Sequence, residues 1–332
     1  MMAHKILERP FIKNPFLTDM INLFDSLRHK KKHYGVASCL LLTGESGSGK
    51  SELAKNYVKN HPVVEDEERT HIPVLHYELR SVATPEEFLR SLLVAIGDPQ
   101  QGRGARNKGE LYARLIILIN TVGLELLILD EIQVIIERRS AKVVTGIADL
   151  FKDLINDTEI PIVFMGMPWS RYLVDSNRQL KRRIAYHYVI PPYRVSQKET
   201  RDDYRRLLKF LGDHYGISKN LKIEDVSFAL RCFAATSGNL AATANLVCDA
   251  FILSDMEGKK ISIQLFANVV RRYGVEDDFN AFKLPIEKLV LRELVVHSDW
   301  SFGSRANKNA IVNAEYIEYG ILKDNKIYCL TG

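Results

Sequence analysis

The sequence predicts an α/β fold in which a parallel sheet flanked by helices precedes a small all-helical region. Two motifs at the ends of apolar runs and a change of pattern near residue 195 carry this prediction. Up to about Pro192, apolar runs alternate with stretches of helical periodicity. The predicted strands are 37–43, 72–79, 124–130, 160–166 and 185–190. Beyond Val195 the strands stop, and the predicted helices are 198–212, 223–236 and 239–254.

The first 35 residues are expected to form a lead-in to the sheet. They contain Pro10 and Pro15, a helix-like run over 17–27 and a basic run from Arg28 to His33. A basic run of this kind is more often the solvated end of a helix than a binding site.

Residues 44–51 form a complete phosphate-binding loop between the apolar run 39–43 and a helix-like stretch, 52–58. Small residues let successive backbone N–H groups curl around phosphates, and the following helix points its positive end at them. Lys50 would reach the β- and γ-phosphates of ATP, and the Ser51 hydroxyl would bind Mg²⁺. The predicted nucleotide-binding residues are Gly44, Glu45, Ser46, Gly47, Ser48, Gly49, Lys50 and Ser51.

A second motif ends the predicted strand 124–130. The run 126–129 is apolar and is followed by Asp130 and Glu131, which suits a strand buried on both faces of a parallel sheet. Ligands of open α/β folds sit at the carboxyl edge of the sheet, so Asp130 is expected to hold Mg²⁺ opposite Ser51. Glu131 is expected to polarise the water that attacks the γ-phosphate. The Asp-Glu pair therefore favours ATP hydrolysis.

Composition and charge are ordinary for a globular protein. The chain has 332 residues, of which 46% are hydrophobic, and its formal net charge of +5 is compatible with a polyanionic partner. The four cysteines show neither close pairing nor metal-ligand spacing, so reduced thiols are expected. The N-terminus has no secretory apolar core, and the longest apolar stretch, 115–129, is interrupted. We therefore expect a soluble cytoplasmic protein without a membrane partner.

Basic residues between the fourth and fifth predicted strands are candidates for an arginine that acts on a neighbouring subunit. An α/β nucleotide domain followed at once by a helical lid is the AAA+ arrangement, in which ATP sits between subunits. The segment Asn177–Ile184 carries arginines whose guanidinium groups could neutralise charge on the neighbour's γ-phosphate. A basic helix end on a solvated surface is the alternative interpretation.

From about Val36 to Pro192 the chain resembles the TnsC/TniB family of transposon-encoded AAA+ ATPases. The segments that carry the resemblance are 44–51, 97–99, 127–133, 149–156, 160–163, 166–168 and 179–183. Arg183 stands at the family's finger position, with Arg182 as the alternative. The total length resembles that of TnsC proteins from CRISPR-associated transposons.

The resemblance implies an α/β AAA+ P-loop NTPase core with a small all-helical lid and a short C-terminal extension. The expected divisions are a lead-in (1–35), a nucleotide-binding domain (36–192), a lid (193–275) and an extension that could bind a partner (276–332). Within the extension a helix is predicted near 285–297.

Two positions depart from the AAA+ pattern. The end of the fourth strand, where many AAA+ proteins carry a polar sensor, reads Met165-Gly166-Met167. The lid helix begins with 237–241 and lacks the arginine that often contacts the γ-phosphate. Hydrolysis is therefore expected to be slow. The family resemblance implies that a partner stimulates it.

The resemblance further implies an ATP-dependent regulator of DNA transposition. Such proteins form rings or helical filaments on double-stranded DNA, link a target selector to the transposase, and leave the DNA after hydrolysis. Contacts blind to sequence should be made to phosphate. Candidate DNA-binding residues are Arg103, Arg106 and Lys108 in a glycine-rich segment, and Arg138, Arg139 and Lys142 after the Asp-Glu strand. Each set is equally well interpreted as solvated loop charge.

Two other functions remain open from the sequence. A helicase-loader-like or initiator-like AAA+ ATPase would share the nucleotide site but serve a helicase or origin DNA. A signalling ATPase would bind protein through its tail and would not bind DNA.

Overall fold

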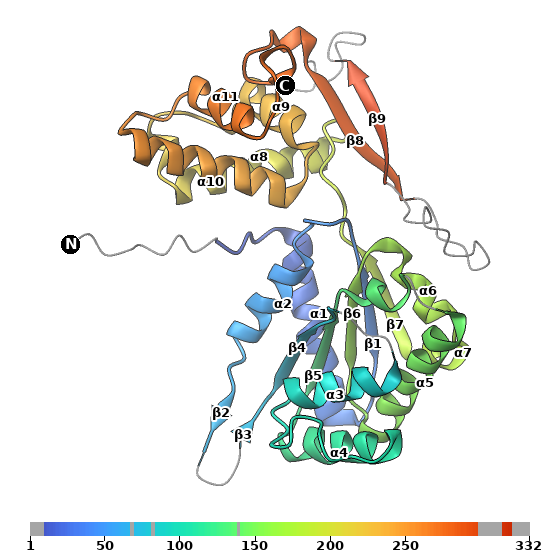
Figure 1. The fold of residues 1–332 in the computed structure, drawn as a ribbon. Helices are drawn as coiled ribbons and strands as arrows, with labels where there is room; N and C mark the ends of the chain where they lie inside the picture. The colour runs from blue at the N-terminus through green and yellow to red at the C-terminus, as the bar shows by residue number, and fades with distance from the viewer. Residues whose placement is uncertain (1–9, 67–69, 81–83, 138–139, 298–313, 321–332) are drawn as a thin grey trace.

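The computed structural model describes residues 10–66, 70–80, 84–137, 140–297 and 314–320. Its centre is a parallel five-stranded sheet in the order β4-β5-β6-β1-β7 (Figure 1). The strands are β1 (Cys39–Thr43), β4 (Val74–Glu78), β5 (Leu126–Asp130), β6 (Ile162–Gly166) and β7 (Ile184–Val189). Strands β1, β5 and β6 are buried at every residue because helices cover both faces. Each predicted strand of the sheet is therefore present.

Alternation along the strands divides the apolar core between the two faces of the sheet. Leu40 and Leu42 pack against α1 (Pro15–Tyr34) and α2 (Lys50–Lys59), whereas Leu41 packs on the opposite face. The helices of that opposite face are α3 (Pro85–Ala95), α4 (Lys108–Thr121), α5 (Ala141–Thr158), α6 (Arg171–Asp175) and α7 (Arg178–Arg183). A short hairpin, β2 (Val64–Glu65) and β3 (Thr70–His71), connects α2 to β4.

A separate helical cluster lies beyond the carboxyl edge of the sheet (Figure 1). It consists of α8 (Lys198–His214), α9 (Val226–Thr236), α10 (Leu240–Glu257) and α11 (Ile263–Arg272). These helices share one apolar core, which includes Tyr204, Phe233 and Phe266. The three predicted helices of this region are present as α8, α9 and α10.

The helix predicted near 285–297 is wrong. That segment forms β8 (Val290–His297), which pairs antiparallel with β9 (Ala314–Gly320). Leu291 and Glu293 are buried while Val290 and Arg292 between them are exposed, which is the alternation of a strand. Leu291 joins the core of the helical cluster, so the first part of β8 packs on α9 rather than standing apart.

Buried Glu293 connects β8 through hydrogen bonds to the segment between the sheet and the helical cluster. Its Oε1 accepts hydrogen bonds from the N–H groups of Val195 (2.7 Å) and Ser196 (2.6 Å), and its Oε2 accepts one from the Ser196 hydroxyl. The side chain has no exposed surface. A buried carboxylate needs such donors, so this strand and the connection hold each other in place.

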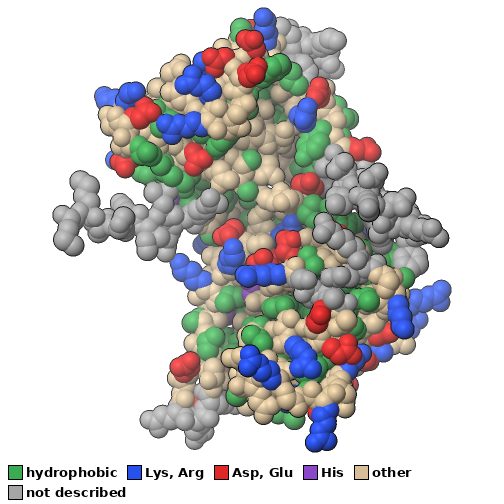
Figure 2. All heavy atoms as spheres, in the orientation of Figure 1, with side chains coloured by type: hydrophobic (Ala, Val, Ile, Leu, Met, Phe, Trp, Pro, Cys, Tyr) green, Lys and Arg blue, Asp and Glu red, His purple; other side chains and the backbone are tan. Residues whose placement is uncertain are grey.

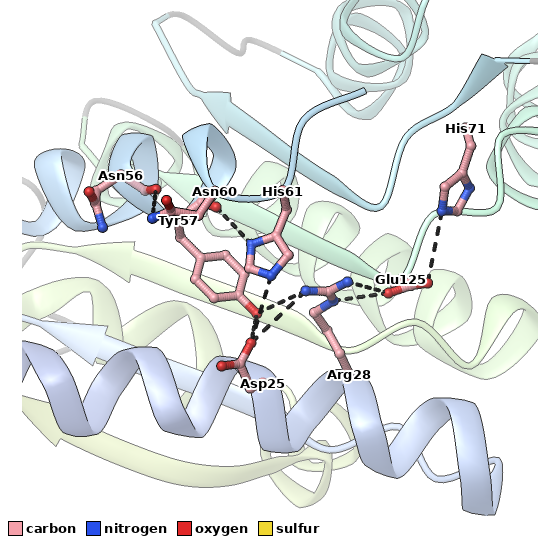
Figure 3. Close-up of polar contacts among 8 residues, drawn as sticks. All are labelled: Asp25, Arg28, Asn56, Tyr57, Asn60, His61, His71 and Glu125. Atoms are coloured by element: carbon pink, nitrogen blue, oxygen red, sulfur yellow. Dashed lines mark hydrogen bonds and ion pairs between the residues drawn. The ribbon is translucent and has the colours of Figure 1, made fainter. Parts of the chain in front are cut away.

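The basic run at the end of α1 is attached to the sheet rather than fully solvated. Lys30 Nζ donates to the Tyr186 hydroxyl, and Lys31 Nζ donates to the Thr158 carbonyl. Arg28 donates through Nε to Glu125, just before β5, at 3.0 Å (Figure 3). The segment therefore has a structural role that explains much of its charge.

Figure 3 shows how Arg28 joins three elements. Its Nη1 donates to the Tyr57 hydroxyl of α2, which in turn donates to Asp25 of α1 at 2.6 Å. Burial opposes the charge of Arg28, but the hydrogen bonds that it donates to Tyr57 and Glu125 raise its pKa above the ordinary value. The network therefore anchors α1 against α2 and β5 at the amino edge of the sheet.

Replacing Arg28 by alanine is expected to lower the free energy of unfolding by about 2 kcal/mol, because Glu125 and Tyr57 would keep their burial but lose their donor. Urea denaturation followed by circular dichroism measures the change. Lys55→Ala is the matched control, since the Lys55–Glu52 pair is mostly exposed, and it should cost less than about 0.5 kcal/mol. Equal losses in the two variants would contradict the structural role given to Arg28.

Two smaller expectations concern thiols and membranes. Cys39, Cys232 and Cys248 are free and buried, and Cys329 lies outside the described residues. Across the described part of the chain, no helix combines the length and apolar character needed to cross a bilayer.

Candidate nucleotide site

The loop 44–49 connects β1 to the first turn of α2 as the sequence predicts. Gly47 and Gly49 have φ angles of 73° and 98°, in the left-handed region that disfavours side chains. A Cβ on Gly47 would also lie 2.7 Å from Asn239 Oδ1. These glycines let the loop curl around the amino end of α2, where free N–H groups suit phosphate oxygens.

Lys50 lies inside this loop. It is 5% exposed, and its Nζ donates to the carbonyls of Gly44 (2.8 Å) and Glu45 (2.9 Å). Burial lowers its pKa, and the nearby carboxylates of Asp130 and Glu131 oppose that change. The ammonium group is therefore held at the centre of the loop, where phosphate oxygens could replace the carbonyls as its partners.

Asp130 ends β5 beside this loop and is completely buried. Its Oδ1 accepts from the N–H of Glu131 at 2.9 Å, and His76 Nε2 lies 3.5 Å from Oδ2. Burial alone would raise the pKa of Asp130, but His76, the Ser51 hydroxyl and the Glu131 N–H lower it below the ordinary value. The sequence did not predict His76. An ionised carboxylate beside a serine hydroxyl is a suitable pair of oxygen ligands for Mg²⁺.

Glu131 follows Asp130 with a φ angle of 60°, which is unusual for a residue with a side chain. The turn leads into the short 3₁₀ helix η1 (Ile132–Ile135). Gln133 of this helix donates through Nε2 to Glu131 Oε2. Burial and the neighbouring Asp130 raise the pKa of Glu131, which makes its carboxylate a better base than an exposed glutamate.

The amino end of α10 contacts the phosphate loop directly. Asn239 Nδ2 donates to the Ser46 carbonyl at 2.8 Å, and the Ala241 N–H donates to the Gly47 carbonyl at 3.0 Å. Asn239 also caps α10, since its Oδ1 accepts from the Ala242 N–H. Helix α10 therefore reaches the loop through backbone groups and an asparagine, without an arginine.

A pocket lies next to the phosphate loop and has an apolar wall. Its apolar wall combines segments that are far apart in the sequence: Pro10, Phe11, Ile12 and Leu17 on one side, and Leu240, Ala241 and Ala244 on the other. Residues 46–52 and Glu131 complete the lining. Sequence reasoning missed this wall, because neither short apolar segment carries a motif.

Arg183 lies at the far end of β1 from the phosphate loop. It precedes Ile184, which pairs with Cys39 at the beginning of β1, and its Nη2 donates to Asn156 at 2.6 Å. The phosphate loop leaves the other end of this strand, about 13 Å along. Helix α7 also packs on the face of the sheet opposite α2. Arg183 is therefore separated by the length of β1 from the phosphate loop of its own chain. Arg182 is exposed beside it.

The glycine-rich segment after α3 is organised around Asp98, a 5% exposed carboxylate. Its Oδ2 accepts from the Gly102 N–H at 2.7 Å and from Arg114 at 3.3 Å. Although burial alone raises the pKa of Asp98, these donors and the Gln100 N–H lower it. Asp98, within the segment 97–99, thus holds this loop in a folded conformation through its hydrogen bonds. Arg103, Arg106 and Lys108 are exposed on or just after this loop.

The first predicted set of DNA-binding residues and Lys142 of the second set lie at opposite ends of α3. The first set follows its carboxyl end, whereas Lys142 begins α5, whose Gly146 lies next to Pro85 at the amino end of α3. Eleven residues of helix separate these ends by about 16 Å. Lys142 is exposed, and Arg138 and Arg139 lie outside the described residues. Figure 2 shows Lys and Arg side chains at the end of the molecule that carries α3 and α4, as well as over the helical cluster and the middle of this face.

Comparison with known proteins identifies both a family match and a fold. A family model described as Bacterial TniB protein matches residues 3–193. No curated protein matches the chain.

Solved structures with the same AAA+ fold include two ORC proteins and a Cdc6 protein. An Aeropyrum pernix ORC2 protein in ADPNP–ADP complexes is 16% identical, with a TM-score of 0.55 over 81% of this chain and 70% of that one. An Aeropyrum pernix ORC1 protein in complex with DNA is 17% identical, with a TM-score of 0.52 over 81% and 67%. Cdc6p from Pyrobaculum aerophilum is 12% identical, with a TM-score of 0.51 over 82% and 71%. At this identity the likeness concerns the fold alone.

Proposed function

The chain belongs to the TniB family of bacterial proteins, and we propose on that premise that it regulates DNA transposition by assembling on DNA with ATP. Copies of the chain would form a ring or helical filament on double-stranded DNA, without sequence preference. The assembly would link a target-selecting protein to the transposase. ATP hydrolysis, stimulated by a partner, would drive disassembly.

The nucleotide chemistry of the proposal follows from the residues at the edge of the sheet. Lys50 and the N–H groups at the start of α2 would bind the phosphates, and the apolar wall would bind the base. Ser51 and Asp130 would hold Mg²⁺, which would supply positive charge to the phosphates. Glu131 would orient and deprotonate the attacking water.

The observation that most strongly supports assembly is the position of Arg183. One copy of the chain has a phosphate loop, a metal pair and a base, but its candidate finger lies at the other end of β1. A head-to-tail contact between copies would bring the two together, and repeated contacts of this type generate rings or filaments. In this proposal residues 36–192 form the nucleotide-binding domain, residues 193–275 form the lid, and residues 276–332 form an extension that binds a partner.

DNA binding is tested most directly by its dependence on salt. We expect the full chain with ATP to bind random-sequence duplex DNA, and each of Arg103→Ala, Arg106→Ala and Lys108→Ala to reduce the salt slope by about 0.9. Fluorescence anisotropy between roughly 50 and 200 mM salt measures the slopes. Lys55→Ala is the matched control, because Lys55 is an exposed cation of α2. Unchanged salt slopes in all three variants would show that the loop between α3 and α4 does not contact DNA.

The alternatives give different results in the same assay. An initiator-like ATPase would prefer particular sequences over random duplex. A signalling ATPase would bind ATP and show no DNA affinity. Either outcome would contradict the transposition proposal, because a regulator that accepts many target sites needs contacts to phosphate rather than to bases.

A further inference from the structure

The carboxyl end of β6 carries no polar side chain of its own. Met165 is completely buried, Gly166 has no side chain, and Met167 contributes its backbone N–H. A polar side chain from another element occupies this position instead. Gln133 Oε1 accepts from the Met167 N–H at 3.1 Å, and Gln133 Nε2 donates to Glu131. A polar amide is thus present between β5 and β6, although the strand sequence lacks one.

The backbone around Gln133 is shaped to bring it there. The left-handed turn at Glu131 starts η1, and the Val134 N–H donates back to the Glu131 carbonyl at 3.0 Å. Gln133 is consequently turned toward β6 and is only 6% exposed. A Cβ on Gly166 would lie 2.6 Å from Gln133 Oε1, so the glycine is what makes room for the amide.

The two hydrogen bonds fix the orientation of the amide. The Met167 N–H can only donate, so it selects the oxygen of Gln133. The amine is then directed at Glu131 and can only donate to it. A rotation of the amide by half a turn would break both interactions, so the buried side chain has one favourable orientation. Glu131 Oε2 is thereby held in place by a donor that has one favourable orientation.

We propose that Gln133 is the positioning residue of the catalytic base, holding the Glu131 carboxylate in the orientation that hydrolysis requires and linking it to the end of β6. This inference rests on the proposed ATPase function. Gln133 does not touch the nucleotide; it acts through Glu131. A general base that is free to rotate spends less time in the reactive geometry, and small misplacements cost large factors in rate.

Gln133→Met tests the inference with a side chain of similar length that cannot donate. We expect kcat for ATP hydrolysis to fall about 10- to 100-fold, with KM for ATP and the affinity for a fluorescent ATP analogue changed less than about threefold. Gln133→Glu, measured at pH 8, offers the Met167 N–H an acceptor but places a second carboxylate beside Glu131. It should lose at least as much kcat as Gln133→Met.

Ser170→Ala is the matched control. Ser170 is completely buried at the same end of β6, and its hydroxyl makes no hydrogen bond within the described residues. Its kcat should stay within about twofold of the unmodified chain. A comparable fall of kcat in Ser170→Ala would show that any change in this region slows hydrolysis and would overturn the inference.

A double-mutant cycle separates positioning from packing. In the Glu131→Gln background, Gln133→Met should change the residual rate by less than about twofold, because the base on which it acts is already absent. If Gln133→Met lowers the rate by the same factor with Glu131→Gln as with Glu131 intact, the inference is overturned. Full activity of either Gln133 variant with Glu131 intact would also overturn it. If the unmodified chain does not hydrolyse ATP with DNA present, the proposed function itself fails, and the inference fails with it.

Discussion

Glu131→Gln is expected to lower kcat for ATP hydrolysis by about a hundredfold or more while ATP binding persists. The amide has nearly the same shape as the carboxylate but cannot accept a proton from water. Lys50 and the first turn of α2, which would hold the phosphates, are unchanged by the substitution. Phosphate release with duplex DNA present measures kcat, and a fluorescent ATP analogue measures affinity.

Glu131→Gln should accumulate on DNA, because its complexes would bind ATP without hydrolysing it. Lys50→Ala is the control that should neither bind ATP tightly nor accumulate. Retention of normal turnover by Glu131→Gln would contradict the role of this carboxylate and would direct attention to another base near the γ-phosphate.

Arg183→Ala is expected to slow hydrolysis by about 10³-fold, at the lower end of what a finger arginine contributes. The loss arises because negative charge that develops on the γ-phosphate would have no guanidinium beside it. ATP affinity of the isolated chain should be nearly unaffected, since Arg183 lies at the opposite end of β1 from its own phosphate loop. Arg182→Ala is the matched control, and it should remain within about threefold of the unmodified chain.

Mixing two inactive variants tests whether the arginine acts on a neighbour. Arg183→Ala keeps its own base, and Glu131→Gln keeps its own finger, so about a quarter of the junctions in a random one-to-one mixture would be complete. Activity should therefore return on mixing. A mixture as inactive as its components would show that Arg183 acts within one chain or not at all. Equal losses of hydrolysis rate in Arg182→Ala and Arg183→Ala would show that neither arginine alone acts as the finger.

Local patterns predicted the sheet well. The runs that became β1, β5 and β6 are short, continuous and apolar, and the residues that follow the first two carry the nucleotide motifs. A buried parallel strand is specified mainly by its own sequence, because helices cover both of its faces. The same reasoning placed the loop 44–51 and Asp130 at one edge of the sheet.

The segment after α11 shows where local patterns fail. Leu291, Leu294 and Val295 fit a helix as well as a strand, and the strand that pairs with β8 begins at Ala314. Glutamate is rarely buried without partners, but the N–H groups of Val195 and Ser196 make the burial of Glu293 favourable. Contacts between such distant residues leave no periodic signal in a single sequence.

The nucleotide site was predicted in part for the same reason. The phosphate loop and the Asp-Glu pair are contiguous motifs, whereas the apolar wall joins Pro10–Ile12 to the start of α10. Asn239 and Gln133 are single polar residues whose partners, Ser46 and Met167, come from other elements. Only the folded chain shows that these groups surround one site.

Sedimentation velocity of the full chain with random-sequence duplex DNA tests the central claim most directly. The samples contain ATP, ADP or no nucleotide, and Lys50→Ala is run beside the unmodified chain. We predict a large complex that requires both ATP and DNA and that is absent with Lys50→Ala. A chain that binds ATP but sediments as a small species and does not bind DNA would contradict the proposal of an ATP-dependent assembly on DNA.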